Sequence, residues 1–462
     1  MRLIYRIKQL MLIGGDWLSY VLAFYVSLFI RNLQSPTWDK IEQHISLFFI
    51  LFLSWLIINF VNGLYDLSEL KKQKFKLYFL EASILSLIFS IIIIYIWPNK
   101  TINPKTILIL NILLGYTLSF FWRKIYNTFV GEKKIFNKIA FVGFESETAK
   151  LIKIIEDRPE LGYKIIFLFD PENKIEQNDF PFFDILHDSQ KILETCKKNK
   201  TQMLIVSPKL KQNQILNQQI YKLLFSNIEI NDLTSFYEVI TGRVTPSVFS
   251  ESWFIENLKT EKQPIYKKIK SLLDYLIGAV IATFFIITFP FIFLIIKINS
   301  PGPVFYRQER VGKNGKIFWL YKYRSMHALN KDGGAELDGA EFATTHDNRI
   351  TKVGKFLRKS RLDELPQFIN LLKGDITLIG PRPERPEIVA QLVEKMPYYN
   401  LRHITKPGLT GWAAVHQHYT DTLEKSLEKL QYDLFYIKNK SFLLDLSILL
   451  RTINVILRMK GQ

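Results

Sequence analysis

The sequence holds a single cysteine and lacks the motifs that mark several common classes of enzyme. With Cys196 alone, no intramolecular disulfide framework can form, which fits a reducing compartment. Histidine and cysteine never cluster with metal-ligand spacing, so nothing supports a zinc site. No nucleophile-elbow motif is present either. The chain therefore lacks the sequence signs of a disulfide-rich secreted protein, a zinc enzyme and a serine hydrolase.

Acidic residues are also scarce relative to basic ones. The chain carries 61 Lys and Arg against 43 Asp and Glu, a formal charge of +18. Such an excess predicts an anionic partner, which could be a phospholipid surface, a nucleic acid or a phosphorylated substrate. A nucleic-acid site would interleave aromatic and basic residues on one face without a carboxylate pair, and no such pattern occurs. We therefore expect membrane and phosphate partners, and no nucleic acid.

Apolar residues make up 48% of the chain, and several long apolar runs lie within residues 1–125. Runs near 10–30, 45–65, 76–97 and 106–121 are each about long enough to cross roughly 30 Å of hydrocarbon as a helix. The flanking cations are Arg2, Arg6, Lys8, Lys71, Lys72, Lys74, Lys76, Arg123, Lys124, Lys133, Lys134 and Lys138. Their positions predict a four-helix transmembrane bundle with both ends in the cytoplasm. Asp16 lies inside the first run, where we expect a structural role. A transporter is disfavoured, because charges are few and no pair of broken helices is evident.

Residues 126–262 have the pattern of an α/β domain. The segment 138–172 reads as strand, turn, helix and strand, and 202–208 reads as a further buried strand, which predicts a Rossmann-like fold. A dinucleotide site would need Gly-x-Gly-x-x-Gly at the first turn. Only Gly143 is present, and Glu145 places negative charge where a phosphate would lie. We expect a scaffold or regulatory domain.

A fifth apolar run lies within residues 266–304 and is interrupted by Pro290. Proline can kink a helix sharply, and lysines stand on both sides of the run. A crossing here would also carry the strongly basic segment that follows out of the cytoplasm. We therefore predict a re-entrant helix at about 271–297, with an ordinary kinked fifth span as the alternative. The β segment that follows carries the cations Arg307, Arg310, Lys322 and Arg324, for which lipid head groups are an alternative partner.

Two adjacent carboxylates, Asp363 and Glu364, stand before Pro366 in the stretch RKSRLDELPQ. Because proline is tolerated only in the first turn of a helix, the helix should begin near Asp363, which becomes an N-cap favouring its ionised form. An ionised Asp among arginines can attack phosphorus or bind Mg²⁺. Downstream, GPRPERPE offers Arg382 and Arg385 to a diphosphate. The competing interpretation is a solvated helix start.

Several long blocks from about 266 to 460 closely resemble the bacterial sugar transferase family, the monotopic polyprenyl-phosphate phosphoglycosyl transferases. The matching blocks are INSPGPVFYRQERVG, YKYRSM, RITKVGKFLRKSRLDELPQFINLLKGDITLIGPRPERPE, YYNLRHITKPGLTGWAAV and EKLQYDLFYIKN. This resemblance implies a mainly helical (α+β) transferase domain over residues 263–462. The preceding part resembles, more weakly, the large subgroup with four spans and a Rossmann-like domain. The protein would then be a multi-pass protein of the bacterial cytoplasmic membrane with its active site facing the cytoplasm.

The resemblance also implies a reaction, in which sugar-1-phosphate passes from a UDP-sugar to undecaprenyl phosphate with release of UMP. This would be the first membrane step of exopolysaccharide, capsule or O-antigen synthesis. Asp363 would be the nucleophile that forms a phosphosugar intermediate, with Mg²⁺ as cofactor held by Asp363 and Glu364. The cationic residues expected to bind substrate are Lys322, Arg324, Arg358, Arg361, Arg382, Arg385 and Arg402. The segment 404–413 would approach the nucleotide. The sugar is not identified, and a homodimer is left open.

The chain departs from the family pattern at two positions. Ala414 follows Gly-Trp-Ala where Gln is frequent, and Phe289 precedes Pro290 where Ser is frequent, so we expect no hydroxyl at that kink. A function of another class would also fit the resemblance, namely a degenerate transferase that senses nucleotide-sugar or lipid-phosphate and organises a glycan assembly complex. The intact Asp-Glu pair argues against that alternative, and turnover would decide between the two.

Overall fold

The computed structural model describes residues 3–67, 75–97, 104–130, 136–176, 180–223, 225–258, 264–328, 349–417 and 422–457. The chain divides into two compact units, Met1–Ile240 and Thr241–Gln462, which are taken in turn. Six of the cations used to predict orientation lie outside the described residues, namely Arg2, Lys71, Lys72, Lys74, Lys133 and Lys134.

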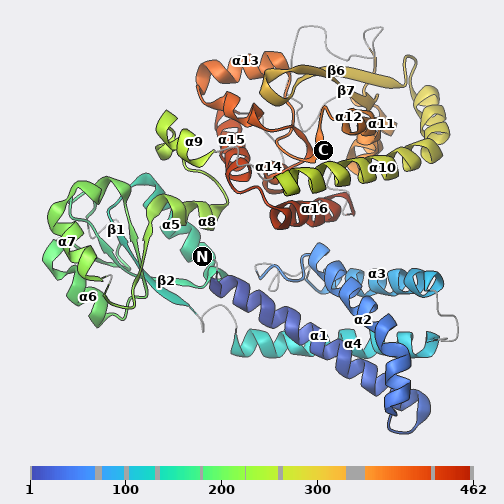
Figure 1. Cartoon of the computed structure of the whole chain (residues 1–462), viewed down its shortest axis with the longest axis horizontal. Coiled ribbons are helices and arrows are strands. Elements are labelled where there is room, and N and C mark those ends of the chain that lie inside the picture. The colour runs from blue at the N-terminus through green and yellow to red at the C-terminus, as the bar shows by residue number, and fades with distance from the viewer. Residues whose placement is uncertain are drawn as a thin grey trace. The chain divides into compact units, whose positions relative to one another are not determined.

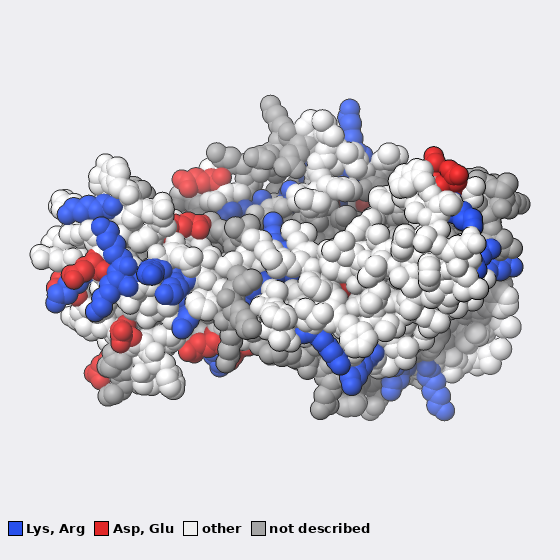
Figure 2. Space-filling model, turned by 90° about the horizontal axis from the view of Figure 1, so that it is seen from below, with Lys and Arg blue, Asp and Glu red and all other residues white. Residues whose placement is uncertain are grey.

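The first unit begins with four long helices, α1 (Leu3–Asn32), α2 (Trp38–Val61), α3 (Phe75–Ile96) and α4 (Lys105–Phe129) (Figure 1). Each coincides with a predicted apolar run and is long and apolar enough to cross a membrane. Figure 2 shows their surface as a broad area with few charges, whereas charges are scattered over the α/β part of the same unit. The predicted apolar helices are therefore confirmed.

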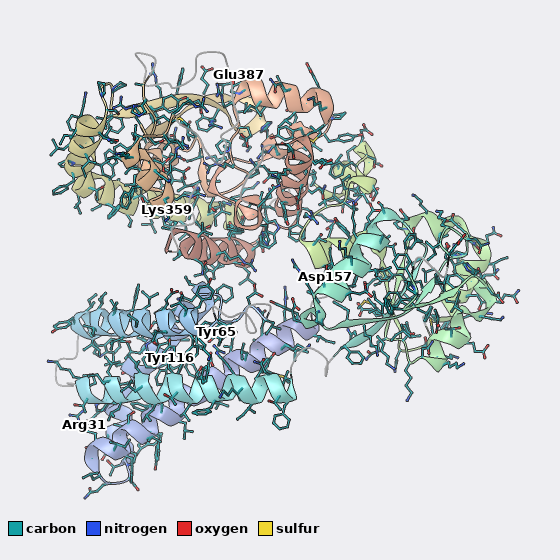
Figure 3. The ribbon with its side chains drawn as sticks, turned by 180° about the vertical axis from the view of Figure 1, so that it is seen from behind. Arg31, Tyr65, Tyr116, Asp157, Lys359 and Glu387 are labelled. Carbon is teal, nitrogen blue, oxygen red and sulfur yellow. The ribbon has the colours of Figure 1, made fainter. Side chains whose placement is uncertain are left out.

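A buried polar network connects these helices. Asp16 of α1 pairs with Arg123 of α4 at 2.7 Å, and both side chains are almost fully buried. Asp16 also accepts hydrogen bonds from Tyr65 and Ser119. Figure 3 shows Tyr65 and Tyr116 between the helices of this part. Arg123 is therefore no loop cation, as the orientation argument assumed, but the partner of Asp16 inside α4, which gives Asp16 the structural contact expected for it.

The α/β part of the first unit has a five-stranded parallel sheet in the order β3-β2-β1-β4-β5. Its strands are β1 (Asn137–Val142), β2 (Tyr163–Phe169), β3 (Asp184–Leu186), β4 (Met203–Val206) and β5 (Glu229–Asp232). Its helices are α5 (Ser146–Asp157), α6 (Ile192–Lys198), α7 (Gln214–Leu223) and α8 (Leu233–Thr241), with 3-10 turns at Pro159–Leu161, Ser189–Lys191 and Pro208–Gln212. The predicted strands and parallel sheet are confirmed.

The turn after β1 is closed to a phosphate by protein groups. Gly143 has a positive φ of 91°, and a Cβ there would lie 2.8 Å from carbon atoms of both Ser207 and Leu210. Glu145 is the N-cap of α5 and accepts a hydrogen bond from Ser207. Lys209 lies 3.3 Å from the same carboxylate. The place of a bound pyrophosphate is thus filled by a carboxylate and its own partners, and the scaffold or regulatory role stays a prediction.

The second unit begins at Thr241, whereas the sequence placed the start of the catalytic domain at 263. It opens with a 3-10 turn at Pro246–Val248 and helix α9 (Glu251–Asn257). Val244, Phe254 and Leu258 of this segment are buried in one core with residues of the C-terminal helices, such as Leu434. Because these apolar side chains find their partners downstream, the segment belongs to the second unit.

The remaining elements of the second unit are short strands and helices around that core. The strands are β6 (Phe305–Val311) and β7 (Ile317–Tyr323), which form an antiparallel hairpin, and β8 (Thr377–Ile379) and β9 (Gly408–Thr410), which pair in parallel. The helices are α10 (Pro264–Asn299), α11 (Lys352–Ser360), α12 (Phe368–Lys373), α13 (Pro386–Lys395), α14 (Trp412–His416), α15 (Leu423–Lys438) and α16 (Phe442–Leu457). 3-10 turns lie at Lys313–Gly315, Leu362–Gln367 and Tyr399–Ile404.

Helix α10 has 36 residues with Pro290 inside it. Figure 1 shows the helix bending between its lime-green beginning and its yellow end. Phe289 stacks on Phe305 of β6 with ring centroids 5.7 Å apart. The expectation that no hydroxyl stands at the kink is wrong, because the Thr288 hydroxyl, one residue earlier, donates to the Phe284 carbonyl at 2.8 Å. Such a bond to the preceding turn is one that often bends helices.

Candidate active site

The Asp-Glu pair lies where helix α11 is broken. The helix ends at Ser360, and the C-cap residue Arg361 adopts the left-handed conformation with φ 59°, a costly one for a residue other than glycine. The chain then enters the 3-10 turn Leu362–Gln367, which contains Asp363, Glu364 and Pro366 and leads into α12. Asp363 is therefore not the N-cap that the sequence predicted, because Arg361 holds that position. The turn packs against β7 and buries Asp363.

Three cations hold the carboxylate of Glu364. Oε1 accepts from Arg382 at 2.8 Å and from Lys322 at 3.4 Å, and Oε2 accepts from Arg361 at 3.4 Å. Burial would raise the pKa of Glu364, but the charges of Arg382, Lys322 and Arg361 outweigh it and hold the pKa well below its usual value. Glu364 is therefore ionised and fixed in orientation.

The neighbouring carboxylate, Asp363, is in a different state. It is 6% exposed, and no group in the described part of the chain donates a hydrogen bond to its oxygens. Burial first, and then the negative charge of Glu364, raise the pKa of Asp363 above its usual value, against the lowering effect of Lys322, Arg358 and Arg361. The expectation that the environment favours the ionised form of Asp363 is wrong. Asp363 is not the N-cap of a helix, and burial disfavours its charged form. The two carboxylates thus differ: Glu364 is hydrogen-bonded to three cations, whereas Asp363 accepts no hydrogen bond from the described residues.

The structure separates the predicted substrate-binding residues into two groups. Lys322, Arg361 and Arg382 surround Glu364, and Arg358 lies near enough to act on Asp363 while its Nε donates to Ser325 at 2.9 Å.

The other three are engaged elsewhere. Arg324 is buried and donates to the carbonyls of Ser300 and Pro301 after α10. The Nε of Arg385 lies 3.5 Å from Glu387. Arg402 is buried and paired with Asp433 at 2.7 Å. Of the predicted set, therefore, the geometry brings four cations to the carboxylate pair.

The segment 404–413 lies beside the proline-rich loop that carries Arg382. Gly408 donates its backbone amide to the Pro381 carbonyl at 2.8 Å, and Gly380 donates to Thr410 at 2.9 Å. Beyond β9, the Trp412 indole donates to the Gly242 carbonyl at 2.8 Å and its ring lies against His416. An approach of this segment to a nucleotide stays a prediction.

An ion network behind the loop was not foreseen from the sequence. Glu384 pairs with Lys429 and lies 3.7 Å from Arg310. Burial would raise the pKa of Glu384, but the charges of Lys429, Arg402 and Arg310 outweigh it and lower the pKa to about 2. Lys429 and Asp433 fall in the matching block EKLQYDLFYIKN, which was the available signal. Lipid head groups do not explain Arg310, because its guanidinium is turned to protein groups.

The donor set fits a magnesium ion better than a softer metal. In the part of the chain that the structure describes, no group of three or more His, Cys, Asp or Glu residues could hold a metal ion. Mg²⁺ needs fewer protein ligands, since it binds one or two carboxylates and completes its shell with substrate phosphates and water. The oxygens of Asp363 accept no hydrogen bond from the described residues and lie beside those of Glu364, so two carboxylates could bind a magnesium ion.

The sequence profile of the bacterial sugar transferase family matches residues 265–459, which include the whole site. A UDP-glucose:undecaprenyl-phosphate glucose-1-phosphate transferase of Caulobacter vibrioides is 37% identical over 186 residues, 40% of this chain and 68% of that protein. The chain belongs to the bacterial sugar transferase family.

Two further members of the family match longer parts of the chain. A UDP-N-acetylgalactosamine-undecaprenyl-phosphate N-acetylgalactosaminephosphotransferase of Aeromonas hydrophila is 40% identical over 232 residues, 50% of this chain and 53% of that protein. The UDP-glucose:undecaprenyl-phosphate glucose-1-phosphate transferase of Escherichia coli K12 is 29% identical over 321 residues, 68% of this chain and 66% of that protein. The alignments thus span between half and two thirds of these two relatives.

Proposed function

We propose that this protein transfers a sugar-1-phosphate from a UDP-sugar to undecaprenyl phosphate and releases UMP. The observation that carries the proposal is the division of the carboxylate pair. Glu364 is held by three cations, whereas Asp363 is buried beside it without a hydrogen-bond donor in the described part of the chain. A carboxylate with unengaged oxygens in a cationic setting suits nucleophilic attack on a phosphorus atom. Membership of the family supports the same reaction.

In the proposed mechanism, an oxygen of Asp363 attacks the β-phosphorus of the donor. A bond forms between the carboxylate and phosphorus while the bond from phosphorus to the bridging oxygen breaks, and that oxygen leaves with its electron pair on UMP. The phosphate of the acceptor lipid then attacks the same phosphorus and frees Asp363. Lys322, Arg358, Arg361 and Arg382 supply positive charge around the reacting groups.

Mg²⁺ is the proposed cofactor, with Asp363 and Glu364 as its ligands. When bound, the ion would neutralise charge on the diphosphate and on the departing UMP. The chain's own contribution is to orient Glu364 through Arg382, Lys322 and Arg361. These cations also keep the Glu364 carboxylate charged for the ion.

We propose further that α1 to α4 form a four-helix bundle crossing the bacterial cytoplasmic membrane, with the active site facing the cytoplasm. Their length and hydropathy support the crossing. The buried pair of Asp16 and Arg123 is consistent with a bilayer, because charged groups within one are paired inside the bundle. The flanking lysines support a cytoplasmic orientation.

Helix α10 is proposed to enter and leave the membrane on the cytoplasmic side. Near its beginning Asp274 accepts from the Leu378 amide at 2.8 Å, and at its end Asn299 accepts from the Val353 amide at 3.3 Å. Both ends are thus attached to the same compact unit, which disagrees with a span that leaves its ends on opposite faces of a bilayer about 30 Å thick. Its outward side is apolar and exposed, with Leu276, Val280, Ile286, Ile287, Phe291, Leu294 and Ile298.

Release of UMP tests the reaction. Purified protein in nanodiscs would receive undecaprenyl phosphate, Mg²⁺ and one UDP-sugar at a time, including UDP-glucose and UDP-N-acetylgalactosamine. We expect release with at least one donor, its abolition by Asp363→Asn, and near-normal release by the control Asp375→Asn, a carboxylate bonded to Asn370. Folded protein that releases no UMP with any donor would refute the proposal and favour a degenerate, ligand-sensing role.

Labelling tests the path of α10. Single cysteines would replace Lys267, in the first turn of α10, and Lys313, which follows β6, and an impermeant maleimide would be added to vesicles of each orientation. The native Cys196 is buried and should stay silent. Re-entry predicts that both sites react from the cytoplasmic side only, whereas labelling from opposite sides would show a crossing.

A further inference from the structure

The loop that carries Arg382 has few backbone amide hydrogens that could donate hydrogen bonds to the rest of the unit. Within GPRPERPE, residues 381, 383 and 386 are proline, so the segment must be fixed mainly through its carbonyls. Two of these carbonyls accept backbone amides, since Pro381 accepts from Gly408 at 2.8 Å and Glu384 accepts from Val311 at 2.9 Å. The two carbonyls between them, on Arg382 and Pro383, have other donors.

Those donors are arginine side chains from distant parts of the unit. Arg402 Nη2 donates to the Arg382 carbonyl at 2.9 Å, and Arg310 Nη1 donates to the Pro383 carbonyl at 3.1 Å. Four successive carbonyls are thus held by four separate donors. The middle two depend on guanidinium groups rather than on sheet or helix.

Both guanidinium groups are themselves fixed by acidic partners. Arg402, 1% exposed, bonds to Asp433 of α15 at 2.7 Å and to the Tyr399 hydroxyl. Arg310 lies 3.7 Å from Glu384 and donates to Gln308 at 2.6 Å. Arg402 is almost fully buried, and both of its Nη atoms are bonded to protein groups, so these atoms are not open to a substrate. Its role must therefore pass through the carbonyl that it holds.

We infer that Arg310 and Arg402 are positioning residues, which hold the proline-rich loop by its carbonyls so that Arg382 reaches Glu364. This inference rests on the proposed function for its consequence in turnover. Arg382 Nη2 donates to Glu364 Oε1 at 2.8 Å, and the backbone carbonyl of the same residue, Arg382, accepts from Arg402. A small displacement at a site of this kind can cost about a hundredfold in rate. Arg310 and Arg402 thus set the geometry of a group that they do not touch.

The first test uses Arg402→Lys, because complete removal would leave the buried Asp433 without its ion-pair partner and risk unfolding. Lysine keeps the ion pair but has no planar fork to reach Asp433 and the carbonyl together. The matched control is Arg243→Lys, since Arg243 pairs with Glu428 of the same helix α15. Arg310→Lys is the second test variant. Hydrogen exchange of the Val311 and Gly408 amides, which donate to carbonyls of the loop, is measured first, and it needs no activity.

We expect faster exchange of these two amides in both test variants and no change in the control. Turnover should fall by roughly 10- to 100-fold in Arg402→Lys, with less than about a threefold change in the donor KM. In an Arg382→Lys background the same change should cost less than about threefold, because the group it positions is already altered. Unchanged exchange, or an undiminished loss of turnover in that background, would overturn the inference. A wild-type chain that releases no UMP would refute the proposed function instead, and exchange of the two amides would still decide the positioning.

Discussion

Replacing Glu384 by glutamine should destabilise the catalytic unit by a predictable amount. The usual pKa of a glutamate is about 4.5. Burial would raise the pKa of Glu384, but the charges of Lys429, Arg402 and Arg310 outweigh burial and lower it to about 2. A tenfold difference in proton affinity corresponds to about 1.4 kcal/mol, so the ionised side chain contributes roughly 3 kcal/mol to folding at neutral pH. Its side chain is 17% exposed, so solvent screens these pairs little.

The assay is the thermal unfolding midpoint of the full chain in detergent. For a unit of this size, roughly 3 kcal/mol lowers the midpoint by about 6–12 °C at pH 7.5. The control Glu428→Gln removes the ion pair between Glu428 and Arg243, in which the Glu428 side chain is 37% exposed. It should cost at most about 1 kcal/mol.

The pH dependence has a definite sign. Because the folded pKa of Glu384 is below the unfolded one, its contribution is complete above about pH 4.5 and is lost as the pH falls toward 2. The gap between wild type and Glu384→Gln should therefore be constant from pH 8 to about 5.5 and smaller at pH 4. Equal midpoints at pH 7.5, or a gap that does not shrink on acidification, would refute the reasoning.

Three further predictions concern other parts of the chain. Burial raises the pKa of Cys196 to about 11, so a maleimide at pH 7.5 should label it only after denaturation, and fast labelling of native protein would contradict the fold. Arg123→Leu should destabilise the helical part by about 3–5 kcal/mol in thermal unfolding, with partial recovery when Asp16→Leu is added, and full additivity would argue against their pairing. UMP release should decline as the pH falls below neutral, because the raised pKa of Asp363 leaves less carboxylate than an exposed Asp would, and a profile flat to about pH 5 would oppose its role.

Features that depend on neighbours in the sequence could be predicted. Long apolar runs allowed the membrane-length helices to be predicted, and short apolar runs bounded by turn residues allowed the strands to be predicted. Both patterns follow from which side chains an element buries. The carboxylate pair, Arg358 and Arg361 were found because they lie close along the chain, whereas Lys322 was found through the family resemblance, and Arg382 through both its proline-rich segment and that resemblance.

Features that depend on distant contacts could not be predicted. Arg123 read as a loop cation, because its partner Asp16 lies 107 positions earlier. Arg402 read as a ligand for substrate, yet its side chain is buried on Asp433 of a later helix. The N-cap at Asp363 failed because Arg361 takes a left-handed conformation that residue type does not reveal. In each case tertiary packing decided where a charged side chain points.

The most direct test of the central claim is to trap the donor's phosphosugar on the protein. Purified protein would be given UDP-sugar labelled at the β-phosphate, with Mg²⁺ and without lipid acceptor, and protein-bound label would be counted. The account predicts label on the wild type, located by peptide mapping at Asp363, absent from Asp363→Asn and removed on addition of undecaprenyl phosphate. Full turnover without any protein-bound label, or equal label on Asp363→Asn, would contradict it.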